Sequence, residues 1–105
     1  MPERTLIQVI LPLRLEWEPC YWADPSVQPG QRVHATFAHR SYLGVVHKVG
    51  VSPDVDESKI NAIDSIETGI EPISKEEIAL WEFIAGYYLC TIGEVYKAAV
   101  PRPGN

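Results

Sequence analysis

The sequence is poor in cysteine and has no apolar run approaching the ~20 residues that a membrane-spanning helix needs. Its two cysteines, Cys20 and Cys90, belong to no CxxC pair. Buried thiols are therefore the simplest interpretation, with a disulfide or a metal ligand as the alternative. The first residues lead directly into a strand-like pattern, which is not the pattern of a signal peptide. We therefore expect a cytoplasmic protein that has no membrane partner.

Motifs that carry enzyme chemistry are also missing. The sequence has no GxxxxGK[ST] loop for nucleotide phosphates, no GxGxxG, no HExxH and no cysteine pair at zinc spacing. Three histidines, His34, His39 and His47, fall near successive predicted strands, which is common by chance and only weakly suggests a metal. Glu16 and Glu18 have strand spacing, but their loop position favours solvent exposure over a pair of hydrolytic carboxylates. We expect no catalytic residue, no metal and no cofactor here, so the chain is not predicted to be an enzyme on its own.

Acidic residues are absent from a long central stretch, although the chain as a whole carries a net charge of −5. Residues 51–105 hold ten acids against four Lys or Arg, whereas no acid occurs between Asp24 and Asp54. This window contains Arg32, Arg40, Lys48 and the three histidines. A small basic surface can bind phosphate locally even on an acidic molecule. Chance clustering on a solvated surface is the alternative interpretation.

Short strands with turn signals between them fill the first two thirds of the chain. The alternation of apolar and polar residues predicts strands at residues 5–13, 20–23, 32–37, 42–51 and 59–67. Pro29-Gly30 suits the middle of a type II turn. Gly44 leaves one face of the fourth strand open, as in a bend or a close approach of two backbones. Residues 59–67 have apolar residues three apart, which also fits a helical turn.

The last third of the chain has helix signals. Ser74 to Glu77 and Thr91 to Glu94 are capping boxes, which predict helices at 75–89 and 92–99. The first helix has an apolar stripe made of Ile78, Trp81, Ala85 and Tyr88. The predicted fold is therefore α+β: a small curled antiparallel sheet or barrel followed by a C-terminal helix pair. We assign residues 1–100 to one domain, β-rich over 5–67 and helical over 74–99, and residues 101–105 to the start of a linker.

Aromatic residues gather in the same half as the acid-free window. They are Trp17, Tyr21, Trp22, Phe37 and Tyr42. Nucleic-acid bases stack on such rings at roughly 1–3 kcal/mol each. Strand alternation places Phe37 and one of Tyr21 or Trp22 in the core. Trp17 lies in a charged loop and is the best candidate for an exposed ring.

Five segments resemble, in the same order, the N-terminal domain of one protein family. They are residues 9–15 (VILPLRL), 29–37 (PGQRVHATF), 43–46 (LGVV), 71–73 (EPI) and 81–100 (WEFIAGYYLCTIGEVYKAAV). The family is the primosomal protein N′ (PriA) helicase. The resemblance implies a domain that binds DNA at stalled forks, where it recognises the 3′ end of the nascent leading strand. It also implies ATP and zinc sites outside this chain and other primosome proteins as possible partners.

The resemblance carries over a pocket for the terminal nucleotide, in which the family places an aromatic residue, then Asp or Thr, then Tyr. These positions fall on Pro19, Cys20 and Tyr21, of which Tyr21 alone matches. Ala38 stands where the family has glycine, and the family's lysine falls on Lys59 or, shifted by two, on Asn61. A thiol is a poor acceptor for a sugar hydroxyl, so the change at Cys20 weakens the expected pocket.

These patterns lead to one assignment and one rival. We assign nucleic-acid binding to Pro19, Cys20, Tyr21, Phe37, Ala38, Arg40 and Lys59. The rival is an adaptor, a small β-barrel that docks on other primosome proteins. The acidic net charge favours the adaptor, whereas the acid-free window and the clustered aromatic rings favour DNA.

Overall fold

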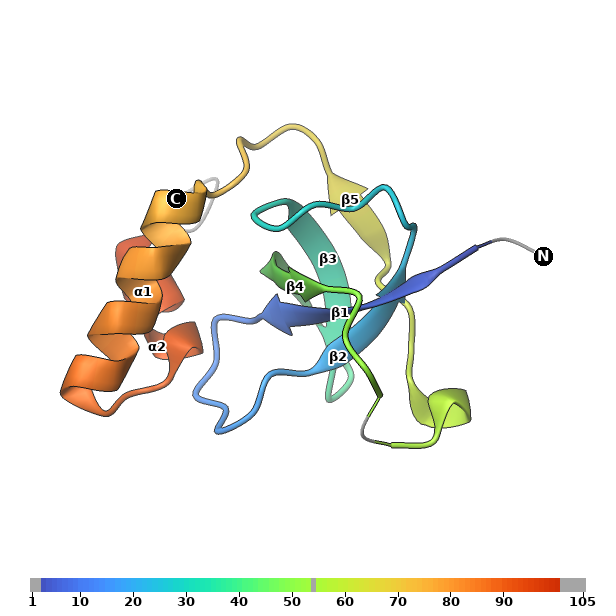
Figure 1. The fold of residues 1–105 in the computed structure, drawn as a ribbon, viewed down its shortest axis with the longest axis horizontal. Coiled ribbons are helices and arrows are strands. Elements are labelled where there is room, and N and C mark those ends of the chain that lie inside the picture. Colours follow the sequence, from blue (N-terminus) through green and yellow to red (C-terminus); the bar gives the residue numbers. More distant parts are fainter. Residues whose placement is uncertain (1–2, 54, 101–105) are drawn as a thin grey trace.

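The computed structural model describes residues 3–53 and 55–100. Figure 1 shows a curled sheet that precedes two helices. The elements are β1 (Thr5–Ile10), β2 (Cys20–Ala23), β3 (Arg32–Phe37), β4 (Arg40–Val49), the 3-10 helix η1 (Glu57–Lys59), β5 (Ser65–Glu67), α1 (Lys75–Tyr88) and α2 (Ile92–Ala99). This order confirms the predicted α+β fold. The expected linker at 101–105 lies outside the described residues.

The five strands form one sheet in the order β2-β1-β4-β3-β5, and each neighbouring pair is antiparallel. The two edges of the sheet meet at Trp22 in β2, which forms a parallel bridge with Ala62. The Trp22 N–H donates to the Asn61 carbonyl at 2.9 Å, and the Ile63 N–H donates to the Trp22 carbonyl at 3.0 Å. This bridge holds the chain before β5 against β2, so the curled sheet becomes an incomplete barrel.

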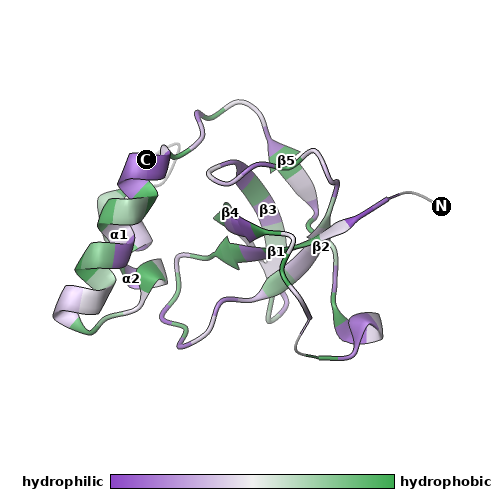
Figure 2. Ribbon diagram, in the orientation of Figure 1, coloured by the Kyte–Doolittle hydropathy of each residue, from purple (hydrophilic) through white to green (hydrophobic). Residues whose placement is uncertain are grey.

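The apolar face of the sheet forms the inside of this barrel. Val33 and Ala35 alternate along β3 and are buried, and they pack with Ile7, Val9 and Val46. Figure 2 shows hydrophobic segments along the strands and both helices, whereas η1 is hydrophilic. Burial of these aliphatic side chains stabilises the curled sheet, because each removes apolar surface from water.

Two glycines allow backbone segments to approach closely. A Cβ atom on Gly44 would lie 2.6 Å from Val9 Cγ1 and 2.9 Å from the Ile10 carbonyl, so the close approach expected at this position occurs. Gly30 has φ +93°, as the predicted Pro-Gly turn requires, and a Cβ there would lie 2.2 Å from the Ile73 carbonyl. The Ile73 N–H also donates to the Gly30 carbonyl at 2.8 Å. These contacts fix the chain against the barrel just before α1 begins.

The helix pair covers one side of the barrel, with Trp81 at the centre of the contact. The Trp81 side chain is 1% exposed and stacks on Tyr96 with ring centroids 5.3 Å apart. Both rings pack in a cluster that includes Ile10 and Val45 of the sheet. The predicted burial of Trp81 is confirmed. No helix in the described part of the chain is long and apolar enough to span a membrane.

Both helices begin where the sequence predicts. The Ser74 side chain accepts the Glu77 N–H at 3.1 Å. At α2 the capping box is reciprocal: the Thr91 side chain accepts the Glu94 N–H, and the Glu94 carboxylate accepts the Thr91 N–H at 3.0 Å. The α1 C-cap, Leu89, adopts the left-handed conformation with φ 55°. Capping thus defines the helix ends locally, independently of tertiary packing.

Three predicted strands differ in extent. β4 spans Arg40–Val49 instead of residues 42–51, because Arg40 already pairs with Phe37 across the two-residue turn. β1 ends at Ile10 instead of residue 13, because Pro12 has no N–H and the Leu13 N–H turns back to the Leu11 carbonyl at 2.7 Å. The strand predicted over 59–67 is reduced to β5, and η1 precedes it. Asp56 caps η1 by accepting the Ser58 N–H at 3.0 Å, an interaction that favours a turn over an extended chain.

The apolar stripe of α1 is shorter than predicted, and the cysteines are less buried. Ile78 and Trp81 are buried and Ala85 is half-buried, but Tyr88 is 69% exposed. Tyr88 lies in the last turn, where it meets the Tyr87 ring edge-on at 4.9 Å instead of the core. Both cysteines are half-buried, and no disulfide joins them.

Candidate nucleic-acid interface

A cavity of about 510 Å³ forms where three segments of the barrel meet. We call it the end cavity. The segments are the loop that enters β2, the turn between β3 and β4, and the chain around η1. The cavity is lined by Trp17, Glu18, Pro19, Cys20, Tyr21, Thr36, Phe37, Ala38, Val55, Lys59, Ile60 and Asn61. All residues assigned to nucleic-acid binding from the sequence lie here except Arg40, and both alternatives for the family's lysine, Lys59 and Asn61, take part.

Backbone hydrogen bonds hold these segments in place. The Val9 N–H of β1 donates to the Pro19 carbonyl at 3.1 Å, which anchors the loop before β2. The Asn61 carbonyl is held by Trp22 through the bridge that joins the sheet edges. The Tyr21 hydroxyl donates to the Thr36 carbonyl at 2.9 Å and so ties β2 to β3. The cavity therefore belongs to the rigid barrel and not to a loose loop.

Tyr21 forms an inner wall of the cavity. It is 4% exposed, and its hydroxyl is already bonded to Thr36. Burial, reinforced by the negative charge of Asp64, raises the pKa of Tyr21 to about 12. Tyr21 is therefore a neutral core side chain, as strand alternation allowed, and it offers a ligand only a small part of its ring.

Trp17 and Phe37 form the aromatic mouth of the cavity. Trp17 is 59% exposed, as predicted for this loop, and its ring centroid lies 5.9 Å from that of Phe37 at an angle of 57°. Phe37 is half-buried. A base can stack on the free face of Trp17, because an aromatic face attracts any base. The sequence identified the exposed ring at Trp17 but did not place it in the pocket; its signal is an isolated tryptophan between two glutamates.

The buried side chain of His47 supports the wall of the end cavity through its hydrogen bond to Glu18. His47 binds Glu18 through Nδ1 and Glu82 through Nε2, the latter at 2.7 Å. The Glu18 hydrogen bond, followed by that of Glu82, raises the pKa of His47 against the opposing effect of burial. Two carboxylates at the two ring nitrogens favour the imidazolium, which donates from both. The sequence prediction of a solvent-exposed Glu18 is therefore wrong, since His47 holds it half-buried in the cavity wall.

The histidines do not form a metal site in the described part of the chain. His34 pairs with Glu67 at 2.8 Å, a carboxylate different from those that bind His47. His39 lies in the turn between β3 and β4 with φ 68°. The three predicted neighbours thus have separate surroundings.

The β3–β4 turn forms the rim of the end cavity. Phe37 pairs with Arg40, so Ala38 and His39 are the two turn residues. Ala38 has φ 51°, and both residues therefore adopt the left-handed conformation of a tight hairpin turn. Such turns favour glycine or asparagine, because a Cβ atom is strained there. The Ala38 methyl group thus narrows the rim at some cost in stability.

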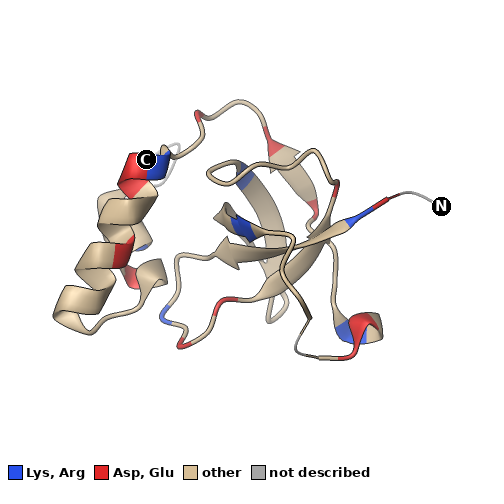
Figure 3. Ribbon diagram, viewed as in Figure 1, with Lys and Arg blue, Asp and Glu red and all other residues tan. Residues whose placement is uncertain are grey.

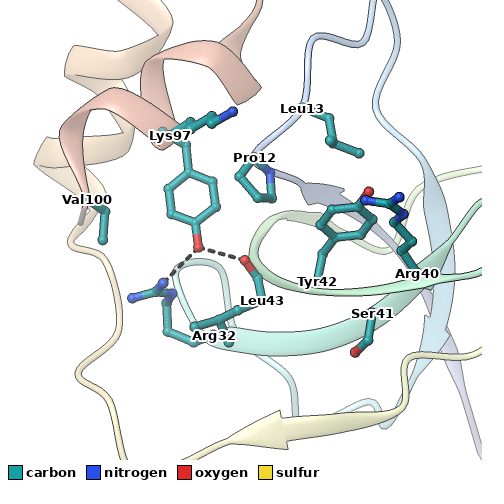
Figure 4. A pocket seen from close by; sticks show the side chains of 10 residues that line it. Pro12, Leu13, Arg32, Arg40, Ser41, Tyr42, Leu43, Lys97 and Val100 are labelled. Atoms are coloured by element: carbon teal, nitrogen blue, oxygen red, sulfur yellow. Dashed lines mark hydrogen bonds between the residues drawn. The ribbon is translucent and has the colours of Figure 1, made fainter. Parts of the chain in front are cut away.

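Arg40 is the predicted site residue that the end cavity lacks. It lines a neighbouring cavity between the β3–β4 hairpin and α2, together with Tyr42 and Lys97 (Figure 4). Figure 3 shows Lys and Arg as isolated positions, whereas acidic residues recur along α1. Arg32 and Arg40 of the acid-free window therefore line this second cavity, whereas Lys59, which lines the end cavity, lies outside the window.

Comparison with known families connects this geometry to DNA. The family model described as the 3′ DNA-binding domain (3′BD) of PriA matches residues 8–101 of the 105-residue chain. The match spans the barrel, the end cavity and both helices, and it favours DNA over the adaptor alternative. The chain belongs to the PriA 3′ DNA-binding domain family and is a DNA-binding module that acts at 3′ ends in replication restart.

Proposed function

We propose that the end cavity holds the terminal nucleotide of a 3′-ended DNA strand. The observation that carries this proposal is the convergence of Pro19, Cys20, Tyr21, Phe37, Ala38 and Lys59 on one cavity of about 510 Å³. Cavities of this size accept small ligands of nucleotide dimensions. Tyr21 limits its depth, so chain beyond the terminal sugar is sterically excluded.

The terminal base stacks on Trp17, and Phe37 supports it from the side. Trp17 has the exposed ring and Phe37 lies next to it at 5.9 Å. Tyr21 contributes a wall and not a stacking platform, because it is buried and hydrogen-bonded. Lys59 adds a positive charge for a phosphate of the same strand.

Glu18 supplies the acceptor that Cys20 lacks. The family has an acid or a threonine at the position of Cys20, where a thiol accepts hydrogen bonds poorly. Glu18 lines the same cavity, and His47 orients its carboxylate through Oε1. We assign the 3′-hydroxyl of the strand to Oε2 of Glu18. A 3′-phosphate is disfavoured there, because two negative charges then meet in a confined site.

Fluorescence anisotropy with paired oligonucleotides tests this proposal. One oligonucleotide ends in a 3′-hydroxyl, and its twin of the same sequence ends in a 3′-phosphate. The hydroxyl end should bind more tightly, and Trp17→Ala should weaken its binding by about 1–3 kcal/mol. Tyr87→Ala removes another exposed ring, on α1, and should leave binding unchanged. Equal affinity of the parent domain for both ends would overturn the end cavity as the site.

We further propose that the domain works within a cytoplasmic ATP-dependent helicase at stalled forks. Family membership supports this setting, with ATP and zinc sites in other domains and other primosome proteins as partners. Trp17→Ala should then reduce unwinding of a fork whose leading strand ends in a 3′-hydroxyl. Unwinding of a fork without a leading strand should be unaffected. Equal loss on both forks would contradict an end-reading role.

A further inference from the structure

The second cavity, which we call the hairpin–helix cavity, has a volume of about 550 Å³ and an unusual charge pattern. It is lined by Pro12, Leu13, Arg32, Arg40, Ser41, Tyr42, Leu43, Tyr96, Lys97 and Val100. Three of these side chains carry a positive charge, and no acidic side chain of the described residues lines it. In a chain of net charge −5, such an enclosure attracts anions locally.

Arg32 is the buried cation of this cavity. It is 3% exposed, and its Nη2 donates to the Tyr96 hydroxyl at 2.7 Å, which in turn donates to the Leu43 carbonyl at 2.7 Å. Burial raises the pKa of Tyr96, so this hydroxyl stays neutral and does not balance the guanidinium charge. The Arg32 Nε is buried and has no hydrogen-bond partner among the described residues.

No carboxylate of the described residues forms an ion pair with Arg32, although the positive charge of Arg32 contributes, after the hydrogen bonds from His34 and Gly69, to lowering the pKa of Glu67. Glu67 is its neighbour across the β3–β5 pair, but Oε1 of Glu67 binds His34 at 2.8 Å and Oε2 accepts the Gly69 N–H at 2.9 Å. Within the described residues, Arg32 forms no ion pair. A buried charge without a partner is costly, and an anion that enters the cavity would reduce this cost. A purely structural role explains the bond to Tyr96 but leaves the guanidinium of Arg32 without an ion-pair partner among the described residues.

Arg40 and Lys97 provide the accessible charges. Both are exposed, one at the start of β4 and the other in α2. Neither forms an ion pair with another described residue. Glu94 lines another cavity with Lys97 and Arg14, but its Oε1 is bonded to Thr91 in the capping box. The two side chains therefore have positive charge to offer a ligand.

The arrangement fits an extended ligand better than a compact ion. Figure 4 shows Arg32, Arg40 and Lys97 distributed around the cavity, with the Tyr42 ring and Pro12 among them. In this view the three side chains do not converge on one point, as the ligands of one compact ion would. A strand offers phosphates at intervals, with sugar and base surfaces that pack on rings. This mixture of dispersed cations and apolar walls matches the surface of single-stranded DNA.

We propose that the hairpin–helix cavity is a second DNA site, which binds a phosphodiester of the strand independently of the end cavity. This proposal rests on the family's DNA-binding function, which identifies DNA as the source of the phosphate. Arg40 and Lys97 each contact a phosphate of the strand, and the buried guanidinium of Arg32 adds positive charge to the cavity. The end cavity identifies the terminus, and this site adds affinity that is indifferent to the terminus.

The test measures the affinity of each variant for the same hydroxyl-ended and phosphate-ended oligonucleotides over a range of salt. Arg40→Gln and Lys97→Gln should each weaken binding to both oligonucleotides by the same factor, roughly three- to tenfold. The slope of log affinity against log salt should fall by about 0.7 for each phosphate that a variant no longer binds. Lys75→Gln removes an equal charge from an exposed position on α1 and should change neither quantity.

The outcomes separate this proposal from the end cavity. If Arg40→Gln and Lys97→Gln bind like Lys75→Gln, the second site does not exist. If they abolish the preference for a hydroxyl end, the cations act in the end cavity and the second site is overturned. If the parent domain shows no end preference but both variants lose affinity, the second site stands and the end cavity fails.

Inorganic phosphate distinguishes a DNA site from a site for the free ion. Titration with inorganic phosphate, followed by NMR, should shift the backbone signals of residues 40–43, and the oligonucleotide should displace the ion. Phosphate that stays bound in the presence of saturating oligonucleotide would overturn the assignment to DNA. Circular dichroism melts of the variants check that they fold, as expected for two exposed side chains.

Discussion

The two cavities share the β3–β4 hairpin as a wall but differ in chemistry. The end cavity combines aromatic rings with the carboxylate of Glu18, whereas the hairpin–helix cavity combines three cations with few rings. A carboxylate favours a hydroxyl over a phosphate, and cations favour any phosphate. On these two proposals, an acidic domain binds DNA by separating the group that reads the end from the groups that attract the backbone.

The largest expected effect comes from substitution of Trp81, which supports the hairpin–helix cavity and not the end cavity. Its ring stacks on Tyr96, which lines that cavity and binds Arg32. Trp81→Ala should lower the free energy of unfolding by about 3–5 kcal/mol, because it leaves a void in the contact between sheet and helices. Urea denaturation measures the change. A loss below about 1 kcal/mol would show that the helices add little to the barrel.

The second largest effect is expected for His47, which supports the end cavity and not the hairpin–helix cavity. His47→Gln should cost about 1.5–3 kcal/mol near pH 6, where the imidazolium donates to both Glu18 and Glu82. The raised pKa of His47 means that this contribution is complete below its ordinary value of about 6.5 and is lost as pH rises through the folded-state pKa. The stability gap between parent and variant should therefore close at alkaline pH.

Denaturation at several pH values between 5 and 9 tests this dependence. The pKa of His47 is raised in the folded domain, so its protonation accounts for the change in the gap. A gap that is constant with pH would show that folding does not shift the pKa of His47. His47→Gln should leave the affinity of the hairpin–helix cavity for DNA unchanged, because His47 does not line this cavity.

A smaller effect separates reading the end from attracting the backbone. Cys20→Asp restores the family's acid in the end cavity and should increase the preference for a 3′-hydroxyl over a 3′-phosphate by about tenfold, or 1.4 kcal/mol. The salt slope for the hydroxyl end should stay the same, because the substitution leaves every cation that binds phosphate in place. Glu18→Gln should act in the opposite direction. An unchanged preference in both variants would remove the carboxylate from end recognition.

The sequence predicts well those features that depend on nearby residues. β2 and β3 have the predicted bounds because alternation acts within the strand, and α2 begins at its capping box because Thr91 and Glu94 are three residues apart. β5 is shorter than predicted, because its length depends on the bridge between Trp22 and Ala62. Such a bridge between segments distant in the sequence leaves no local signal.

The candidate site follows the same rule. The resemblance placed residues around Tyr21, Phe37 and Lys59, and the structure brings them to one cavity. The resemblance did not indicate Glu18. The position of Glu18 depends on its hydrogen bond to His47, 29 residues further along the chain, and His47 is in turn bound by Glu82, another 35 residues further on. The acid-free window indicated Arg40, which the structure places in the neighbouring cavity between the β3–β4 hairpin and α2.

The smallest effect lies in the hairpin that both cavities share. Ala38 has φ 51°, where the methyl group costs about 1–2 kcal/mol, and glycine adds about 0.4–1 kcal/mol of entropy to the unfolded chain. Ala38→Gly introduces the residue that the family has at this position, and it should therefore stabilise the domain by about 0.5–1 kcal/mol. Ala79→Gly, on the exposed face of α1, should destabilise it by a similar amount.

Binding then shows whether the hairpin couples the two cavities. Ala38→Gly opens the rim of the end cavity but touches no cation, so the hydroxyl preference should change while the salt slope does not. A change in both the hydroxyl preference and the salt slope would mean that the substitution in the turn also displaces Arg40. The two cavities would then respond as one site. If Ala38→Gly destabilises the domain as Ala79→Gly does, the left-handed turn is not the conformation of the protein in solution. Urea denaturation and the paired oligonucleotides decide between these results, because strain at Ala38 affects stability and the width of the rim affects binding.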